Sequence, residues 1–501
     1  MKTKKGLLIY PPVQLMEEEK PRPDGSLGLL YLASALEQRG IETDILDASV
    51  GSNKQDLKDT FYNYVKQENG LVRVGMDFKE IADYVVKGAY DFVGINSNLT
   101  PQSRMAFETA KAIRQTESPI EIYAGGVNAR ALKERFLESG YFDAVCITEG
   151  EIVFPRAVIE SARNVPGFAY VNENGEIKTN PVDETCFPKH LDDLLMPAWE
   201  KLPLDKYGKI LSPHGVDVTD KKGQKYSPII TSRGCVWHCD YCHISTEKKD
   251  IGKLRTHSIE RVLEEMDCLK SLGIEKLFFE DNTLLTRKKR IKELFTKAKD
   301  KGFSIANVNG VNLIDFYDRK NWELDLDYLR ILREAGHSQL VFPVESGSQR
   351  ILDRYASGKV QLDKMDLPIL MKTMTEMGIK APVNMMIGFP DETEEEVKKS
   401  IELGRLLKQE GAPYVSFFLP IPFPGSKLYD LAIEKGYLNK DFDSDMMNWK
   451  RAVMKNTLIL PERLEEIRDH ANELVNDADF ITNAIEQTIG YKLKKGMGDG
   501  E

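Results

Sequence analysis

Cysteine and histidine are scarce in this 501-residue chain, which has six of the first and seven of the second. Three of the six cysteines, Cys235, Cys239 and Cys242, are packed into one short stretch. The other three are too few for the disulfide framework of a secreted scaffold. We therefore expect a reducing, cytoplasmic setting.

Long apolar runs and an excess of positive charge are also lacking. The apolar run near the start, 7–10, ends at a proline pair and is too short for a signal peptide; no run long enough to span a membrane follows. The formal net charge of -10 disfavours a nucleic-acid partner held by phosphate neutralisation. We expect a monomer with neither a membrane nor a nucleic-acid partner.

The length suffices for two or three domains with sizeable cores. Composition and pattern divide the chain into a first domain at 1–165, a proline-rich linker at 166–222, a second domain at 223–440 and a small helical domain at 441–501. The last domain contains no cysteine, so it holds no auxiliary cluster. We expect it to close the second domain or help bind substrate, with a plain structural cap as the alternative.

The first domain alternates buried apolar strands with helices. Expected strands are 6–10, 43–47, 91–95, 120–124 and 143–147, and expected helices are 27–38, 103–114, one from 129 and one after 149. Right-handed crossovers then give an open, doubly wound, Rossmann-like α/β sheet, which binds ligands beyond the carboxyl ends of its strands.

The turns after these strands are rich in glycine and small polar residues, which allow a ligand to approach the backbone closely. By themselves these residues indicate only that some ligand binds, for instance a nucleotide. They are equally compatible with ordinary turns that bind nothing. The candidate binding residues are Tyr10, Pro11, Asn98, Gly125, Gly126, Val127, Thr148, Glu149 and Gly150.

The three clustered cysteines have the spacing CxxxCxxC and follow a short apolar strand that ends near Ile230. This spacing is too tight for a disulfide framework and one ligand short of a closed tetrahedral zinc site. Thiolates select zinc or iron-sulfur, and a cluster held by three cysteines keeps one iron open. A zinc site completed by His238 or His243 is the alternative.

With an aromatic residue, Tyr241, before the last cysteine, the motif resembles the signature of the radical S-adenosylmethionine superfamily. The resemblance implies that Cys235, Cys239 and Cys242 hold a [4Fe-4S] cluster whose fourth iron binds S-adenosylmethionine. One electron from the cluster then cleaves the sulfonium to a 5'-deoxyadenosyl radical, so an electron donor is required.

The second domain reads as six strands with longer helices, which fits the partial (β/α)6 TIM barrel of that superfamily, with its chemistry at the carboxyl ends of the strands. The strands after the cysteine loop are expected at 276–280, 303–307, 339–343, 382–387 and 414–419. The resemblance implies that S-adenosylmethionine meets residues at these strand ends and Tyr241. Those at the strand ends are Phe279, Glu280, Asp281, Asn309, Glu345, Ser346 and Gly388.

Ahead of such a barrel, the first domain resembles the cobalamin-binding domain of many radical S-adenosylmethionine enzymes, with its turns near the cofactor's nucleotide tail. Many of those domains ligate cobalt with a histidine, but no histidine precedes His190 here. We therefore expect cobalamin in a base-off form without a histidine ligand. The same departure suits a domain that binds no cobalamin.

The two domains together resemble the cobalamin-dependent radical S-adenosylmethionine (class B) methyltransferases, in which cobalt carries a methyl group that a substrate radical collects. In its compact length, the chain resembles the enzymes of this family that methylate a glutamine α-carbon of methyl-coenzyme M reductase in methanogens. We therefore expect a peptide or protein substrate.

Three other functions use parts of the same pattern. A cobalamin-linked radical cyclase or rearranging enzyme would use the same cofactors without net methylation. A non-catalytic cobalamin-binding sensor would leave the cysteine motif without a purpose. A methylthiotransferase would need three further cluster cysteines in the first domain, where only Cys146 lies.

Overall fold

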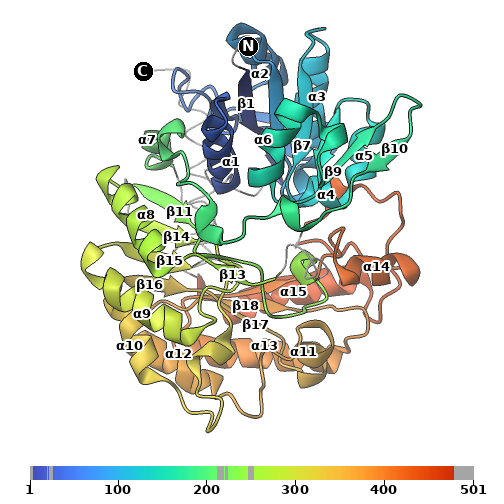
Figure 1. Cartoon of the computed structure of the whole chain (residues 1–501). Helices are drawn as coiled ribbons and strands as arrows, with labels where there is room; N and C mark the ends of the chain where they lie inside the picture. The colour runs from blue at the N-terminus through green and yellow to red at the C-terminus, as the bar shows by residue number, and fades with distance from the viewer. Residues whose placement is uncertain are drawn as a thin grey trace, which may run out of the picture. The chain divides into compact units, whose positions relative to one another are not determined.

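The computed structural model describes residues 4–17, 19, 21, 26–210, 219, 224–245, 253–307, 309–448 and 450–478. Figure 1 traces the chain, which forms two compact units that divide after residue 213. The second helix expected in the last domain, at 480–491, lies outside the described residues. None of the described helices is long and apolar enough to cross a membrane.

The first unit is built on a seven-stranded sheet with the order β10-β9-β8-β7-β6-β1-β3. Its first five strands along the chain are parallel, which confirms the doubly wound sheet. They are β1 (Lys5–Tyr10), β3 (Glu42–Asp47), β6 (Phe92–Asn96), β7 (Glu121–Gly125) and β8 (Ala144–Cys146). The strand order reverses between β1 and β6, the place where such sheets bind ligands.

Two antiparallel strands extend this sheet beyond β8. β9 (Phe168–Val171) pairs with β8, and β10 (Ile177–Thr179) closes a hairpin over the turn at 172–175. The sequence interpretation gives this hairpin its turn but assigns it to the linker. In the structure it belongs to the sheet of the first unit.

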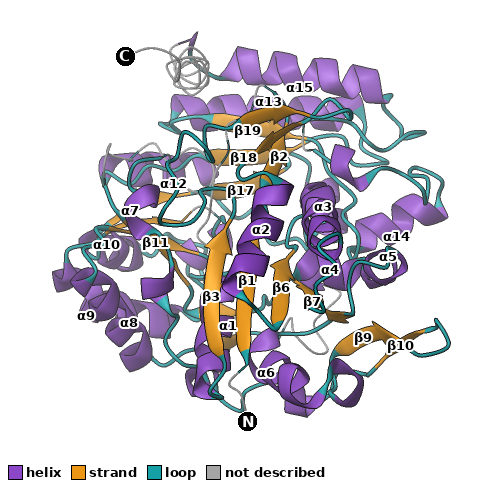
Figure 2. Cartoon of the chain, turned by 90° about the horizontal axis from the view of Figure 1, so that it is seen from above, coloured by secondary structure: helices purple, strands orange, loops and turns teal. Residues whose placement is uncertain are grey.

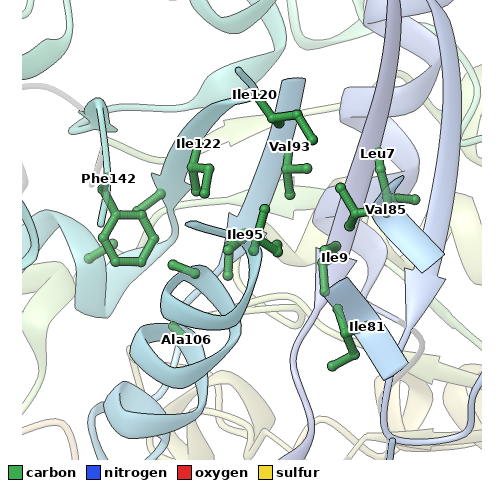
Figure 3. Packing of buried hydrophobic residues seen from close by; sticks show 14 of the residues in the cluster. Leu7, Ile9, Ile81, Val85, Val93, Ile95, Ala106, Ile120, Ile122 and Phe142 are labelled. Carbon is green, nitrogen blue, oxygen red and sulfur yellow. The ribbon is translucent and has the colours of Figure 1, made fainter. Parts of the chain in front are cut away.

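Helices cover both faces of the sheet (Figure 2). On one face α1 (Leu27–Gln38) and α6 (Gly150–Glu160) pack together. The other face carries α2 (Phe78–Gly88), α3 (Ser103–Arg114), α4 (Val127–Ala131) and α5 (Lys133–Glu138). Figure 3 shows the core beneath this second group, where alternate strand residues such as Ile9 and Ile95 meet helix residues such as Val85.

Two further segments pack onto the first unit. β2 (Val13–Leu15), β4 (Tyr64–Lys66) and β5 (Val72–Val74) form a small antiparallel sheet. The short helix α7 (Leu204–Tyr207) holds the loop after β3, because the Lys206 ammonium group donates to the carbonyls of Val50, Ser52 and Gln55 at 2.7–2.8 Å. The Tyr207 hydroxyl donates to the buried Asp47 carboxylate at 2.7 Å.

The second unit contains six parallel strand runs. β11 (Tyr226–Ile229), β14 (Lys276–Phe279), β15 (Ser304–Asn307) and β16 (His337–Leu340) form one sheet, and β17 (Phe342–Glu345), β18 (Val383–Met386) and β19 (Val415–Phe418) form the next. Only Val341 separates β16 from β17, so one extended run pairs first with β15 and then with β18. This arrangement confirms the partial (β/α)6 barrel.

Helices alternate with the barrel strands. They are α8 (Ile259–Ser271), α9 (Lys288–Ala298), α10 (Leu326–Glu334), α11 (Gln349–Tyr355), α12 (Leu367–Glu376), α13 (Glu394–Gln409) and α14 (Lys427–Glu434). A two-stranded ribbon of β12 (Ser232–Arg233) and β13 (Arg255–Thr256) stands at the carboxyl end of β11.

The last described helix, α15 (Pro461–Val475), covers the edge of β19. Asn476 accepts from the amide of Val415 and donates to its carbonyl, both at 2.8 Å, and Asn472 accepts from the amide of Phe417 at 3.2 Å. An open sheet edge exposes unpaired backbone groups, and side-chain amides satisfy them here. The segment 461–476 therefore covers the edge of the second barrel sheet.

Candidate functional site

The cysteine loop leaves the carboxyl end of β11 through Thr231 and Ser232, and a buried carboxylate anchors this exit. Asp281 accepts from the Thr231 amide at 3.0 Å, the Thr231 hydroxyl at 2.8 Å and the Ser232 hydroxyl at 2.5 Å. Arg290 of α9 donates to the Thr231 carbonyl at 3.3 Å. Both Asp281 oxygens are thus occupied by the loop, so this predicted cofactor residue acts on the loop that carries the cysteines.

The far side of the loop is fixed by backbone hydrogen bonds. The Asp240 amide donates to the Tyr355 carbonyl, and the Leu428 amide donates to the Asp240 carbonyl, each at 2.8 Å. The amide of His238 donates to the Ser357 hydroxyl at 2.7 Å. Residues from α11 and α14 therefore hold the loop in place between its cysteines.

A buried ion pair lies beside the cysteines. The Lys359 ammonium group donates to the Glu345 carboxylate at 2.8 Å, and the Tyr241 hydroxyl donates to the same oxygen at 2.7 Å. Burial lowers the pKa of Lys359, but the negative charge of Glu345 and the thiol of Cys239 outweigh it and raise that pKa. The lysine is therefore charged at neutral pH.

The three thiols suit a soft metal group. Cys239 is buried, and burial raises the pKa of its thiol and raises the pKa of Cys242 to about 11. Binding a metal group must therefore displace protons from them. In the described part of the chain, no three His, Cys, Asp or Glu side chains converge as ligands of one ion would. A cluster spreads its three thiolates over separate irons, so it does not require the three cysteines to converge on one ion.

The other residues predicted to meet S-adenosylmethionine fall into two groups. The Asn309 amide donates to Glu280 at 2.9 Å, so the structure brings these two polar groups together at the strand ends. The ring of Phe279 packs on Phe295 and His337 in the core, which leaves only its backbone for a ligand.

Ser346 and Gly388 serve the conformation of their loops. The Ser346 hydroxyl, fully buried, lies 3.2 Å from that of Ser400 and accepts from the Ser348 amide. The amide of Gly388, at φ 96°, donates to the Glu392 carboxylate at 2.7 Å. Burial raises the pKa of Glu392 to about 8 although the amides of Gly388 and Phe389 oppose it.

At the carboxyl ends of β7 and β8 in the first unit, two buried polar atoms have no hydrogen-bond partner, namely Asn128 Oδ1 and Thr148 Oγ1. The Asn128 amide nitrogen donates to the hydroxyls of Ser97 and Ser103 at 2.8 and 2.9 Å, which fixes the orphaned oxygen in place. Buried polar groups are normally paired, so this region has unfilled capacity for a polar ligand.

The glycine pair at the end of β7 differs in its two members. A Cβ on Gly126, at φ 105°, would lie 2.5 Å from Asn98 Oδ1, whereas a Cβ on Gly125 would meet nothing within 4 Å. The protein itself therefore requires glycine at 126 but not at 125. The Val127 amide donates to Asn98 Oδ1 at 3.4 Å, which brings together turns that follow β6 and β7.

The remaining predicted residues of this unit also lie at strand ends. Tyr10 ends β1 and Pro11 follows it, both buried. Glu149 precedes α6 without a side-chain cap, so the first amides of this helix, from Gly150, have no cap from that side chain. Helix N-termini favour negatively charged groups, such as the phosphate of a nucleotide tail. The turns at the carboxyl ends of the strands in the first unit thus suit the binding of cobalamin.

Sequence reasoning missed Lys359 and Glu392, and it placed Asn128 in the turn after the strand at 120–124 without choosing it as a binding residue. Lys359 lies in a loop after α11, and only its burial beside Glu345 distinguishes it from surface lysines. Asn128 lies two residues after the glycine pair, and Glu392 lies two residues after the G-x-P segment, so the sequence position of each residue pointed to the site.

Comparisons with known proteins agree with both units. A model of the B12 binding domain matches residues 25–158, and one of the radical SAM superfamily matches residues 229–404. An uncharacterized methyltransferase of Pyrococcus horikoshii is 28% identical over 90% of this chain and 86% of its own. The cytidylyl-2-hydroxyethylphosphonate methyltransferase of Streptomyces wedmorensis is 26% identical over 90% of this chain and 85% of its own.

Two solved structures share the fold. The radical S-adenosylmethionine methyltransferase TsrM of Kitasatospora setae superimposes with a TM-score of 0.62 at 17% identity, over 86% of this chain and 76% of its own. The cobalamin-dependent radical enzyme OxsB gives a TM-score of 0.61 at 17% identity, over 87% of this chain and 56% of its own.

Proposed function

Because the chain belongs to the cobalamin-dependent radical S-adenosylmethionine methyltransferase family, we propose that it is a C-methyltransferase acting on an unactivated carbon. The observation that carries this proposal is the cysteine loop, anchored by Asp281 and flanked by the buried Lys359–Glu345 pair, in a chain whose first unit offers unfilled polar atoms at its strand ends.

Each part of the chain has a defined task. Cys235, Cys239 and Cys242 hold the cluster, and Glu280 offers a carboxylate to the ammonium group of S-adenosylmethionine. The turns after β7 and β8 hold cobalamin. When bound, the cluster supplies one electron for cleavage of S-adenosylmethionine, and cobalamin supplies a methyl group that a carbon radical can take.

Cobalamin is proposed to bind base-off with no histidine below the metal. No histidine precedes His190 in the chain, and His190 lies in the segment after β10, beyond the strands and turns predicted to hold cobalamin. The test is an absorption and electron paramagnetic resonance spectrum of the protein reconstituted with cob(II)alamin. Nitrogen hyperfine splitting from an axial ligand would contradict the base-off proposal.

As the substrate we propose a glutamine residue in a peptide, of the kind methylated at its α-carbon in methyl-coenzyme M reductase. The compact length supports this choice. A second candidate is a nucleotide-linked phosphonate, which the similarity to the cytidylyl-2-hydroxyethylphosphonate methyltransferase favours.

The test is an anaerobic incubation of the reconstituted enzyme with dithionite, methyl-deuterated S-adenosylmethionine and each candidate substrate. We expect mass spectrometry to place the labelled methyl group on the glutamine of the peptide. Label on the phosphonate alone would contradict the peptide proposal. Formation of 5'-deoxyadenosine with an altered, unlabelled substrate would contradict methylation and favour a rearranging enzyme.

A further inference from the structure

Positively charged side chains cluster at the N-terminus of α9. Four consecutive cations, 287–290, stand there although the net charge of the chain is -10. With Ile259 and Glu293 they line a surface depression of about 380 Å³. The only carboxylate of this lining, that of Glu293, is engaged by Lys297 at 2.9 Å. We call this lining the basic patch.

Some of the positive charges of the basic patch are not paired with a carboxylate. Lys288 is paired with Asp325 at 3.3 Å. Arg287 and Lys289 are exposed, and no carboxylate lies within ion-pair range of either among the residues that the structure describes. Two cations at least are therefore available to an acidic partner.

The basic patch adjoins the base of the cysteine loop. Arg287 donates to the Thr256 hydroxyl of β13, the strand paired with the start of the loop, at 3.4 Å. Arg290 donates to the Thr231 carbonyl at 3.3 Å. Cys235 lies four positions after Thr231 in the chain, and such a segment spans at most about 14 Å. A molecule seated on the basic patch therefore lies within a short distance of the cysteine ligands.

We propose that the basic patch docks a small acidic one-electron carrier protein, which reduces the cluster. In this step the carrier loses one electron and the cluster gains it, and no covalent bond forms or breaks. The inference rests on the proposed function, because that chemistry requires an electron. Charge complementarity is needed here, since the rest of an acidic chain repels an acidic carrier.

A nucleic acid fits the basic patch less well. Nucleic-acid binding proteins commonly neutralise about six to ten phosphates, and the basic patch offers few unpaired cations in one small depression. An acidic protein needs only a local match of charge to be steered into an encounter, which raises association rates by about tenfold or more.

The test compares cluster reduction by two donors in stopped-flow absorbance, using the reconstituted full-length protein. One donor is a purified flavodoxin in its hydroquinone state, and the other is dithionite. The variant is Arg287→Glu/Lys289→Glu, and the matched control is Lys372→Glu/Lys399→Glu, which makes the same charge change at exposed positions on α12 and α13.

We expect the patch variant to lower the rate with flavodoxin about tenfold at low ionic strength and to flatten its dependence on salt. Dithionite reduction and the control should match the unaltered protein. An unchanged flavodoxin rate in the patch variant would overturn the proposal.

Two further outcomes are decisive. If the patch variant is also slow with dithionite, the test is repeated with Lys289→Glu alone, because Lys289 has no ion pair with any of the described residues. An unchanged flavodoxin rate in that variant overturns the proposal. Failure of the docking proposal is separable from failure of the proposed function, because 5'-deoxyadenosine formed with dithionite reports the latter independently.

Discussion

Lys359 and Glu345 form an ion pair of 2.8 Å in which the side chains are only 10% and 8% exposed. Glu345 reaches this position with a left-handed backbone at φ 70°, which is sparsely populated for residues other than glycine. Such strain persists only where the surroundings over-determine it. The Tyr241 hydroxyl donates to Glu345, so the pair also positions Tyr241, which lies between Cys239 and Cys242 in the chain.

Replacing Lys359 with Met should lower the free energy of unfolding by about 3–5 kcal/mol, because it leaves the Glu345 carboxylate buried without its partner. Adding Glu345→Gln should recover part of this loss, since the buried charge is then removed. Chemical denaturation of the two single variants and the double variant measures the coupling. Losses that simply add would show that the pair contributes no coupling energy.

Asp281 and Glu280 are neighbours with different roles, so their amide variants should differ. Asp281→Asn replaces an acceptor of the loop's hydrogen bonds with a donor, and we expect the iron content after reconstitution to fall by at least about half. Glu280→Gln should keep the iron and weaken S-adenosylmethionine binding about tenfold through loss of a charge-assisted hydrogen bond. Iron assays measure the cluster content of each variant, and calorimetry measures its affinity for S-adenosylmethionine. Equal iron content in the two variants would refute the anchoring role of Asp281.

Glu392 makes the stability of the barrel depend on pH. Its pKa is about 8 when buried and 4.5 when exposed, so the folded chain keeps a proton that the unfolded chain releases between these values. The free energy of unfolding should therefore fall as pH rises from about 4.5 to 8, then level off.

The variant Glu392→Gln should reduce this slope by up to about 1.4 kcal/mol per pH unit. Glu265, whose pKa burial raises to about 7, remains in the variant and gives a slope of the same sign over the narrower range from about pH 4.5 to 7. Urea midpoints between pH 5 and 8 measure the difference. Parallel curves for both proteins would rule out Glu392 as the source.

The glycine pair gives a test of the cobalamin site that separates folding from binding. Gly125→Ala should leave the thermal unfolding temperature unchanged, since its Cβ meets no protein atom, yet reduce the cobalamin retained after gel filtration. Gly126→Ala should lower the unfolding temperature, because its Cβ would meet Asn98. Full retention by Gly125→Ala would remove this position from the cobalamin site.

The sequence predicts those helices and strands whose position is determined by the local pattern of apolar residues. The helices 27–38 and 103–114 have the observed bounds, and the barrel strands deviate by one or two residues, because apolar runs bounded by glycine are read locally. The sequence predicts the turn between β9 and β10 but places this hairpin in the linker, since no local signal says which sheet a hairpin joins.

The site was predictable only in part, for the same reason. The motif identifies the three cysteines, because their spacing carries the chemistry. It does not reveal that both Asp281 oxygens face the loop or that Lys359 is buried against Glu345, since these contacts join residues that are distant in sequence. Phe279 lies at the end of the strand predicted at 276–280. However, successive side chains of a strand point to opposite faces, and the ring of Phe279 points into the core.

The most direct test of the central claim is the ratio of products in one anaerobic turnover assay with dithionite and the correct substrate. A methyltransferase that uses one S-adenosylmethionine as methyl donor and a second as radical source should form S-adenosylhomocysteine, 5'-deoxyadenosine and methylated product in equal amounts. Formation of 5'-deoxyadenosine without S-adenosylhomocysteine would contradict the account.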